Sequence, residues 1–455
     1  MKKILSIIFL GAALFGTTSC VSEEDLLFDK SAAERLNEAS SLYSQRLLDS
    51  PHGWALEYYA HSTTDEDDPM KGAGFLMMTK FDKDKSVLVA MNNHLTYYYY
   101  KEDRSAWEVI TDNGPVLSFN THNDVLHTFS IPEDVPGTAE DETGKGLEGD
   151  YEFVMVDVPE GGDYITLKGK KRGAYSRLTK LEEETDFKEY LTDVRTFTDK
   201  MFNPKAPNHN IITIGENRYN MIMAQDGGLY GIVKMWPEGT DSTFTKEVLP
   251  MIVTRHGVKD AYTYNVRFRS AIKGANDAAE QEFVYNAASQ SFSGKTDSKC
   301  SIAGPNPNDF MAERLKANAT LTFTANMDAS DDITSALTAI KNDFAAVKYT
   351  FNNVKFRNSE QGFRAAVAYR NAKKQNVTTY YNFNWKQNTD GSISFEYVSP
   401  ADESGETLLK SLPSIAEFFK VISDTYNVKS YDNAMDLTTV VFDAGSKNFV
   451  NSPVY

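Results

Sequence analysis

Residues 74–91 read GFLMMTKFDKDKSVLVAM, which is the pattern of a β-hairpin. Two apolar runs, Gly74 to Phe81 and Ser86 to Met91, flank the polar segment Asp82-Lys83-Asp84-Lys85. Short runs of apolar and β-branched residues that are separated by a few turn-forming residues are typical of paired antiparallel strands. We therefore predict two strands joined by a turn at residues 82–85.

The chain continues on both sides of this hairpin as short predicted strands. Trp54 to Tyr59 precedes the hairpin. The strands predicted after it are Leu95 to Tyr100, Ala106 to Thr111, Val116 to Asn120, Tyr151 to Val158, Tyr164 to Lys171 and Ser176 to Leu181. Regular spacing of short strands favours a β-sandwich or a barrel.

Amphipathic helices are predicted ahead of two strand-rich regions. Ser31 and Glu34 form a capping-box pattern at the start of a helix over residues 31–49, which Pro51-His52-Gly53 ends. A second helix is predicted over residues 186–202, and further ones at 309–317, 333–346 and 413–425. The expected fold is α+β, dominated by antiparallel strands, with two packed β-rich domains at residues 31–182 and 183–455, each preceded by a helix.

The N-terminus carries a targeting pattern. Lys2 and Lys3 precede an apolar run at residues 4–15, which is shorter than the roughly 20 residues of a membrane span. The run leads to Cys20, so residues 1–19 resemble a bacterial lipoprotein signal peptide whose cysteine is acylated. We expect residues 20–30 to form an acidic tether; the alternative is an incidental cysteine after an ordinary signal peptide.

Directly after Cys20 come Ser22, Glu23, Glu24 and Asp25. This acidic cluster resembles the surface-export signal of Bacteroidota lipoproteins. It implies an outer-membrane protein that faces the cell surface, and an ordinary solvated tether on the periplasmic side is the alternative.

Composition excludes several classes of function. The 455 residues carry a formal net charge of −17, which disfavours nucleic-acid binding, because phosphate contacts need a basic surface. Two cysteines are too few for a disulfide scaffold or a zinc-finger array, and we expect Cys300 to be an unpaired structural residue.

Motifs of catalysis, cofactor binding and metal binding give no assignment. Gly144-Lys145-Gly146-Leu147-Glu148-Gly149 matches G-x-G-x-x-G but precedes a predicted strand, whereas a dinucleotide site needs a following helix. Asp65-Glu66-Asp67-Asp68 lacks the spacing of a calcium loop. His122 and His127 are five residues apart, which on a strand places them on opposite faces. We assign no catalytic residue, no cofactor and no metal.

Aromatic residues are the remaining candidates for ligand contact. Tyr97-Tyr98-Tyr99-Tyr100 is the densest cluster, and on a strand Tyr98 and Tyr100 share one face. Tyr98, Tyr100 and Trp107 are our candidate ligand-binding residues, as an exposed platform for sugar stacking; burial in the core is the alternative.

Several stretches together resemble domain-of-unknown-function family 4302 of Bacteroidota lipoproteins. They are residues 28–36, Gly53-Trp54, residues 114–120, residues 149–154 and residues 167–171. The family implies no activity and no catalytic residue. Similar lipoproteins tend to be encoded beside SusC/SusD-like importers, which suggests a role in nutrient capture.

We therefore expect a non-enzymatic lipoprotein that binds a glycan, a peptide or an importer subunit. Two alternatives stay open: a hydrolase that uses an unidentified carboxylate pair, and a structural, adhesin-like lipoprotein.

Overall fold

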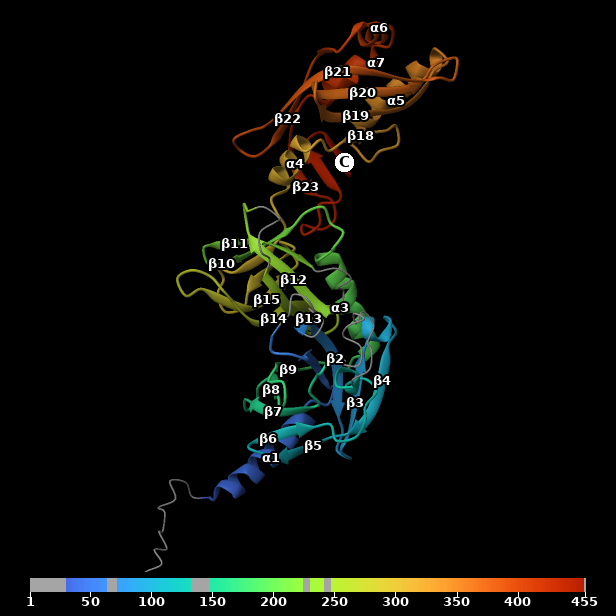
Figure 1. Cartoon of the computed structure of the whole chain (residues 1–455). Helices are drawn as coiled ribbons and strands as arrows, with labels where there is room; N and C mark the ends of the chain where they lie inside the picture. Colours follow the sequence, from blue (N-terminus) through green and yellow to red (C-terminus); the bar gives the residue numbers. More distant parts are fainter. Residues whose placement is uncertain (1–29, 64–71, 132–146, 224–229, 241–246, 454–455) are drawn as a thin grey trace, which may run out of the picture.

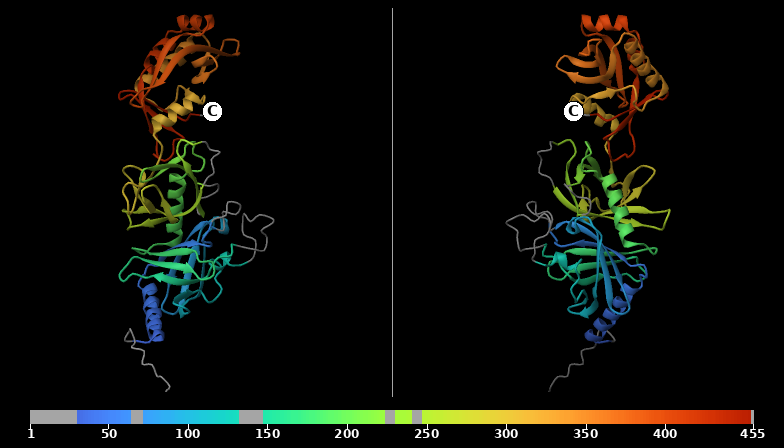
Figure 2. Two further views of the ribbon diagram at one scale, coloured as in Figure 1. Left: turned by 60° about the vertical axis from the view of Figure 1, so that its left-hand side comes forward. Right: turned by 90° about the vertical axis from the view of Figure 1, so that its right-hand side faces the viewer.

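The computed structural model describes residues 30–63, 72–131, 147–223, 230–240 and 247–453. The described chain is elongated, with helix α1 at one end and helix α6 at the other (Figures 1 and 2). Its strands pair antiparallel throughout and form two sheet systems, one from β1 to β17 and one from β18 to β25. The predicted α+β fold with two β-rich domains is confirmed.

The first nine strands form one continuous antiparallel run in the order β4-β3-β2-β1-β9-β8-β7-β6-β5. Their bounds are β1 Trp54–Tyr59, β2 Gly74–Phe81, β3 Ser86–Met91, β4 Lys101–Ala106, β5 Glu108–Thr111, β6 Pro115–Ser118, β7 Glu152–Asp157, β8 Tyr164–Gly169 and β9 Tyr175–Lys180. The predicted hairpin at residues 74–91 is confirmed, with Asp82 N–H donating to the Ser86 carbonyl at 2.9 Å.

Helix α1 (Ala32–Leu48) precedes this run, and its N-terminus explains where it begins. The Ser31 side chain accepts a hydrogen bond from Glu34 N–H at 3.2 Å, and the Glu34 carboxylate accepts one from Ser31 N–H at 2.9 Å. This reciprocal cap satisfies two backbone donors that have no partner within the helix.

Strands β10 to β17 pair each with the next, and β17 pairs back with β10, which closes a barrel. Their bounds are β10 Asn210–Ile214, β11 Asn217–Met223, β12 Tyr230–Pro237, β13 Glu247–His256, β14 Thr263–Lys273, β15 Ala279–Asn286, β16 Ser291–Gly294 and β17 Ser301–Ala303. Helix α3 (Phe187–Met201), capped by Asp186, covers it.

The barrel and the first nine strands share contacts. β12 pairs with β2 through Gly231 and Gly74, and one apolar cluster contains Met78 of β2 and Val194 of α3. Arg267 Nη1 of β14 donates to the Glu57 carboxylate of β1 at 3.3 Å, and burial raises the pKa of Glu57. The predicted boundary at residue 182 falls between β9 and α3, inside this first system; the domain boundaries stay a prediction.

The C-terminal system is an eight-stranded sheet in sequence order with its own apolar core. Its elements are α4 Pro307–Lys316, β18 Leu321–Phe323, α5 Asp331–Ala346, β19 Thr350–Ser359, β20 Gly362–Arg370, β21 Asn376–Gln387, β22 Ile393–Pro400, α6 Glu403–Ser411, α7 Ser414–Ile422, β23 Thr425–Ser430, β24 Val440–Asp443 and β25 Asn448–Asn451. Helices α5 and α7 pack on each other and on the sheet.

The loop between β23 and β24 joins this sheet to the barrel. Asn208 donates to the Met435 carbonyl at 3.0 Å and accepts from Leu437 N–H at 2.9 Å, while Asn203 donates to the Asp436 carboxylate at 2.7 Å. These hydrogen bonds set the C-terminal sheet at the end of the barrel that lies away from α1 (Figure 1).

Three local predictions are wrong. Leu95 to Tyr100 is not a strand; it holds the 3-10 helix η1 (His94–Thr96) and a turn. Helix α5 begins at Asp331, two residues before its predicted start at residue 333. The single helix predicted at 413–425 is the shorter α7, and α6 before it was not predicted.

Candidate functional site

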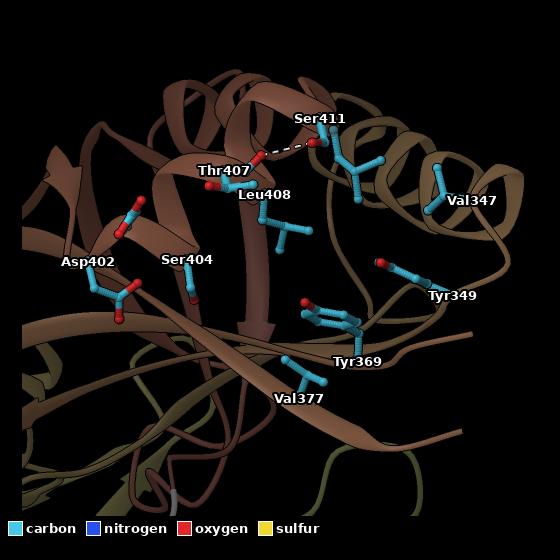
Figure 3. A pocket seen from close by; sticks show the side chains of 11 residues that line it. Val347, Tyr349, Tyr369, Val377, Asp402, Ser404, Thr407, Leu408 and Ser411 are labelled. Atoms are coloured by element: carbon cyan, nitrogen blue, oxygen red, sulfur yellow. Dashed lines mark hydrogen bonds between the residues drawn. The ribbon is translucent and has the colours of Figure 1, made fainter. Parts of the chain in front are cut away.

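A cavity of about 790 Å³ opens on the C-terminal sheet between the end of α5, strands β20 and β21, and helix α6. Figure 3 shows tyrosine and valine side chains on one side, and on the α6 side hydroxyl and carboxyl groups together with the apolar side chain of Leu408. We call this cavity the distal pocket. It is lined by Val347, Tyr349, Tyr369, Val377, Asp402, Glu403, Ser404, Thr407, Leu408, Ser411 and Leu412.

Two stacked tyrosines form the aromatic side of the distal pocket. The rings of Tyr349 and Tyr369 have centroids 5.3 Å apart and planes 19° apart, and Phe344 meets Tyr369 edge-on at 5.0 Å. Tyr369 is 7% exposed, and burial raises the pKa of its hydroxyl. Tyr349 is half-buried, and its side chain extends into the cavity with the hydroxyl group at its tip (Figure 3).

The end of helix α5 places Tyr349. Lys348 adopts a left-handed backbone with φ 61°, its N–H donates to the Ala345 carbonyl at 3.0 Å, and Tyr349 N–H donates to the Phe344 carbonyl at 2.8 Å. This pair of bonds is the Schellman motif, in which the residue after the left-handed one folds back against the last helical turn. The ring is thus held by backbone geometry as well as by stacking.

Helix α6 supplies the polar side. The Asp402 carboxylate caps it by accepting from Gly405 N–H at 2.8 Å, which is the reason that the helix begins there. Glu403, Ser404 and Thr407 lie on its exposed surface next to the cavity. Figure 3 marks the bond from the Ser411 hydroxyl to the Thr407 carbonyl, which is 2.9 Å long.

Helix α6 lies close against strand β21 beneath it. Tyr381 of β21 is fully buried and donates to the Gly405 carbonyl at 3.2 Å, and burial raises its pKa to about 12. A Cβ at Gly405 would lie 2.9 Å from the Tyr380 carbonyl, so only glycine lets the helix approach the strand this closely.

This arrangement combines a flat apolar surface with hydrogen-bond acceptors across a cavity. Such a combination is common in binding sites for small polar molecules. The two acidic residues, Asp402 and Glu403, are consecutive at one helix start, whereas hydrolysis by a carboxylate pair requires acids on both sides of the bond that breaks.

A second cavity of about 680 Å³ lies at the start of β7. Lys170 contacts Asp112 at 2.7 Å and Glu152 at 2.9 Å, and Arg172 contacts Glu148 at 2.6 Å. The charges at this cavity therefore neutralise one another. For this reason the second cavity is a weaker candidate for ligand binding than the distal pocket.

The residues predicted as a ligand platform do not form one surface. Trp107 is 1% exposed and packs edge-on against Phe81 at 5.1 Å, so the prediction of an exposed stacking ring at this position is wrong. Tyr98 and Tyr100 do not alternate on a strand, because Tyr97 and Tyr98 have left-handed backbones with φ of 52° and 62°. Tyr98 instead lies under the Arg195 guanidinium at 4.3 Å.

The two histidines are closer than the strand argument predicted. His127 belongs to the 3-10 helix η2 (His127–Phe129), and its ring centroid lies 5.2 Å from that of His122. His122 contacts Asp124 at 2.9 Å and His127 accepts from Asn123 N–H at 3.0 Å. Across the described ranges, no group of three or more His, Cys, Asp or Glu side chains is arranged to hold a metal ion.

Some predicted features lie outside the described residues. They are Cys20, Ser22, Glu23, Glu24, Asp25, the acidic run at 65–68 and Gly144 to Gly146 of the glycine-rich motif. Gly149, at the end of that motif, packs beside Phe129, and Cys300 is fully buried. In the part of the chain that the structure covers, no helix combines the length and the apolar character that a bilayer span requires.

The distal pocket was not predicted from the sequence. Its residues come from four separate elements between positions 347 and 412, so no local motif joins them. The one usable signal was Asp402, followed by Glu403 and Glu406 and then by Lys410, which is the charge order of a capped helix.

Comparisons with solved structures give no usable likeness. The DNA polymerase III β subunit from Thermotoga maritima is 9% identical over 91% of this chain and 97% of its own, with a TM-score of 0.15. The β subunit of the DNA polymerase from Streptococcus pyogenes is 9% identical over 91% of this chain and 98% of its own, with a TM-score of 0.13. Kievitone hydratase from Nectria haematococca is 8% identical over 90% of this chain and 90% of its own, with a TM-score of 0.10. Scores this low carry no argument about fold or function.

No curated protein matches the chain. The sequence pattern of the family described as domain of unknown function DUF4302 matches residues 24–290, which is more than half of the chain. The matched part contains strands β1 to β9 and the barrel strands β10 to β15, whereas β16, β17 and the distal pocket lie beyond it. This chain is therefore a member of the DUF4302 family.

Proposed function

We propose that this protein is a lipid-anchored, non-enzymatic binding protein of the bacterial cell surface, which captures a glycan or peptide in the distal pocket. The observation that carries the proposal is the position of that pocket, at the opposite end of the elongated chain from helix α1 (Figures 1 and 2). An anchor just ahead of α1 would hold the pocket away from the membrane.

The anchor itself is proposed from the sequence. Cys20 follows a short apolar run, and the acidic residues Glu23, Glu24 and Asp25 follow Cys20. Two or more acyl chains on one cysteine give stable membrane attachment, since a single chain binds only marginally. The capped start of α1 at Ser31 leaves about ten residues of tether between lipid and fold.

A SusC/SusD-like importer is the proposed partner. This part rests on the resemblance to lipoproteins that are encoded beside such importers. An elongated protein with its ligand site at the far end suits the capture of a ligand outside the membrane, before such an importer takes the ligand up.

The anchor is tested in cells that express the full chain and are fed a fatty-acid probe. Cys20→Ala should abolish acyl labelling and release the protein from membranes. Replacing Glu23, Glu24 and Asp25 together with alanine should keep the label but remove accessibility to protease on intact cells. Accessibility that persists in the triple variant would contradict the export role of the acidic residues.

The binding function is tested with the full chain purified in detergent. We expect it to bind glycans or peptides on an array, to co-purify with an importer component from its native cells, and to leave the bound ligand intact. Turnover of a polysaccharide or peptide, lost on substitution of one Asp or Glu, would show a hydrolase instead.

A further inference from the structure

We propose that the distal pocket binds a saccharide through one pyranose unit that carries no negative charge, and that a protonated amine on this unit strengthens binding. The inference rests on the proposed binding function and names the ligand of the same site. It follows from the two unlike walls of the pocket, and from the way in which its strands are paired.

The aromatic wall suits the face of a sugar ring. Tyr349 offers a half-buried ring whose other side is stacked on Tyr369, so the surface that remains is flat and fixed. The C–H groups on one face of a pyranose are apolar and pack on such a ring. Val347 and Val377 extend the apolar surface beside the tyrosines.

The opposite wall suits hydroxyl groups. Asp402, Glu403, Ser404 and Thr407 lie along the first turns of α6, and all four are exposed. Carboxylates are strong acceptors for hydroxyl donors, and serine and threonine hydroxyls both donate and accept. A ring held between the two walls would turn one face to Tyr349 and its hydroxyls to α6.

The charge of the pocket selects among saccharides. Its described lining contains two carboxylates and no basic side chain, and the nearby Lys410 is paired with Glu406 at 2.6 Å. A uronate or sulfate group would meet like charge at this wall, whereas a protonated amine would meet opposite charge. The tyrosine rings favour the amine as well, because a cation is attracted to an aromatic face.

The pairing of the strands argues against an extended peptide. β20 pairs with β19 on one side and β21 on the other, and β21 pairs with both β20 and β22. The strands beneath the pocket therefore offer no free edge to which a peptide backbone could add as another strand. Recognition must come from side chains, which suits a compact ring.

The test presents the detergent-purified full chain to an array of neutral, amine-bearing, uronate and sulfated oligosaccharides together with peptides. Affinities of the strongest glycans are then measured by calorimetry at pH 6, where an amino sugar is cationic. We expect binding to be confined to neutral and amine-bearing glycans, with uronate counterparts weaker by about tenfold or more.

Variants locate the binding in the pocket. Tyr349→Leu keeps apolar volume and removes the ring, so it should weaken binding about tenfold, the scale of one aromatic contact, while Tyr349→Phe should retain it. Glu403→Gln should reduce the advantage of amine-bearing glycans. Tyr99→Ala, on the exposed turn at residues 97–99, is the control that should change nothing.

The outcomes separate the two proposals. Uronates that bind as tightly as neutral glycans, or binding unaffected by Tyr349→Leu, would overturn the inference. Binding of peptides alone, lost in Tyr349→Leu, would overturn the inference and keep the proposed function. If neither glycans nor peptides bind, both proposals fail.

Discussion

The chain has two clusters of tyrosine that differ in how they are supported. On the turn at residues 97–99, Tyr97 and Tyr99 are 72% and 77% exposed. In the distal pocket, Tyr369 is 7% exposed and Tyr349 is half-buried and stacked on it. The tyrosines of the turn are consecutive in the sequence, whereas the two tyrosines of the pocket are 20 positions apart.

The difference teaches that a dense run of aromatic residues in the sequence does not predict where aromatic rings line a cavity. The rings of Tyr97 and Tyr99 stand in solvent, and the backbone of the turn is held by Asn93, whose carbonyl accepts from Tyr98 N–H at 2.8 Å. The pocket pair has a core behind it and a wall of hydrogen-bonding groups in front. A ligand can be enclosed only in the second arrangement.

Removal of the core behind the pocket should have the largest effect. Phe344 is fully buried against Tyr369, so Phe344→Ala should cost the C-terminal sheet about 3–5 kcal/mol through lost contacts and a cavity. Hydrogen–deuterium exchange of amides in β19 to β21 measures the loss. Tyr99→Ala on the exposed turn should change stability by less than about 0.5 kcal/mol. A similar loss of stability at both positions would contradict the claim that the two tyrosine clusters are supported differently.

Alkaline pH should lower stability through Tyr381, which is buried beneath helix α6. Its pKa is raised to about 12 by burial, whereas an unfolded tyrosine ionises near its ordinary value of 10. Between pH 10 and 12 the unfolded state therefore releases a proton that the folded state keeps, and stability falls as pH rises. This contribution is fully present below pH 10 and is lost on passing pH 12.

Urea denaturation between pH 9 and 12 measures that contribution when wild type is compared with Tyr381→Phe. The stability advantage of wild type should shrink by about 2–3 kcal/mol over this range, from a shift of two pKa units. Because other buried tyrosines titrate in both proteins, only the difference is assigned to Tyr381. Parallel pH curves would contradict the assignment.

The smallest effect is expected on the turn. Tyr97 has φ 52°, a conformation that costs an L-residue roughly 1–2 kcal/mol and glycine almost nothing. Tyr99 is not among the positive-φ residues of the described chain. Tyr97→Gly should therefore leave the protein about 1 kcal/mol more stable than Tyr99→Gly, as compared by thermal unfolding. Equal melting temperatures would show that the turn is not strained.

Predictions from the sequence succeeded where the signal is local. The strands Trp54–Tyr59, Gly74–Phe81 and Ser86–Met91 have the predicted bounds, and helix α1 has the predicted cap at Ser31. Alternating or continuous apolar runs and capping residues act over a few positions, so one segment of sequence contains the information.

Predictions failed for two reasons, a side-chain cap that overrides the composition of residues 95–100 and a distant contact that stabilises helix α6. Leu95 to Tyr100 has the composition of a strand, but the Asn93 side chain and carbonyl hold it in a short helix and turn. Helix α6 contains Gly405, a poor helix former, and is stabilised by contact with Tyr381 from β21.

The sequence by itself determined the antiparallel α+β character of this protein, its leading helix, its acidity and the cysteine of its proposed anchor, because each depends on composition or short-range pattern. Only the tertiary structure decided which aromatic residues are exposed and which meet α6 across a cavity. Tyr349, Tyr369 and Asp402 line one cavity because of strand pairing and helix packing. Both kinds of contact join residues far apart in the sequence, so no short sequence pattern predicts them.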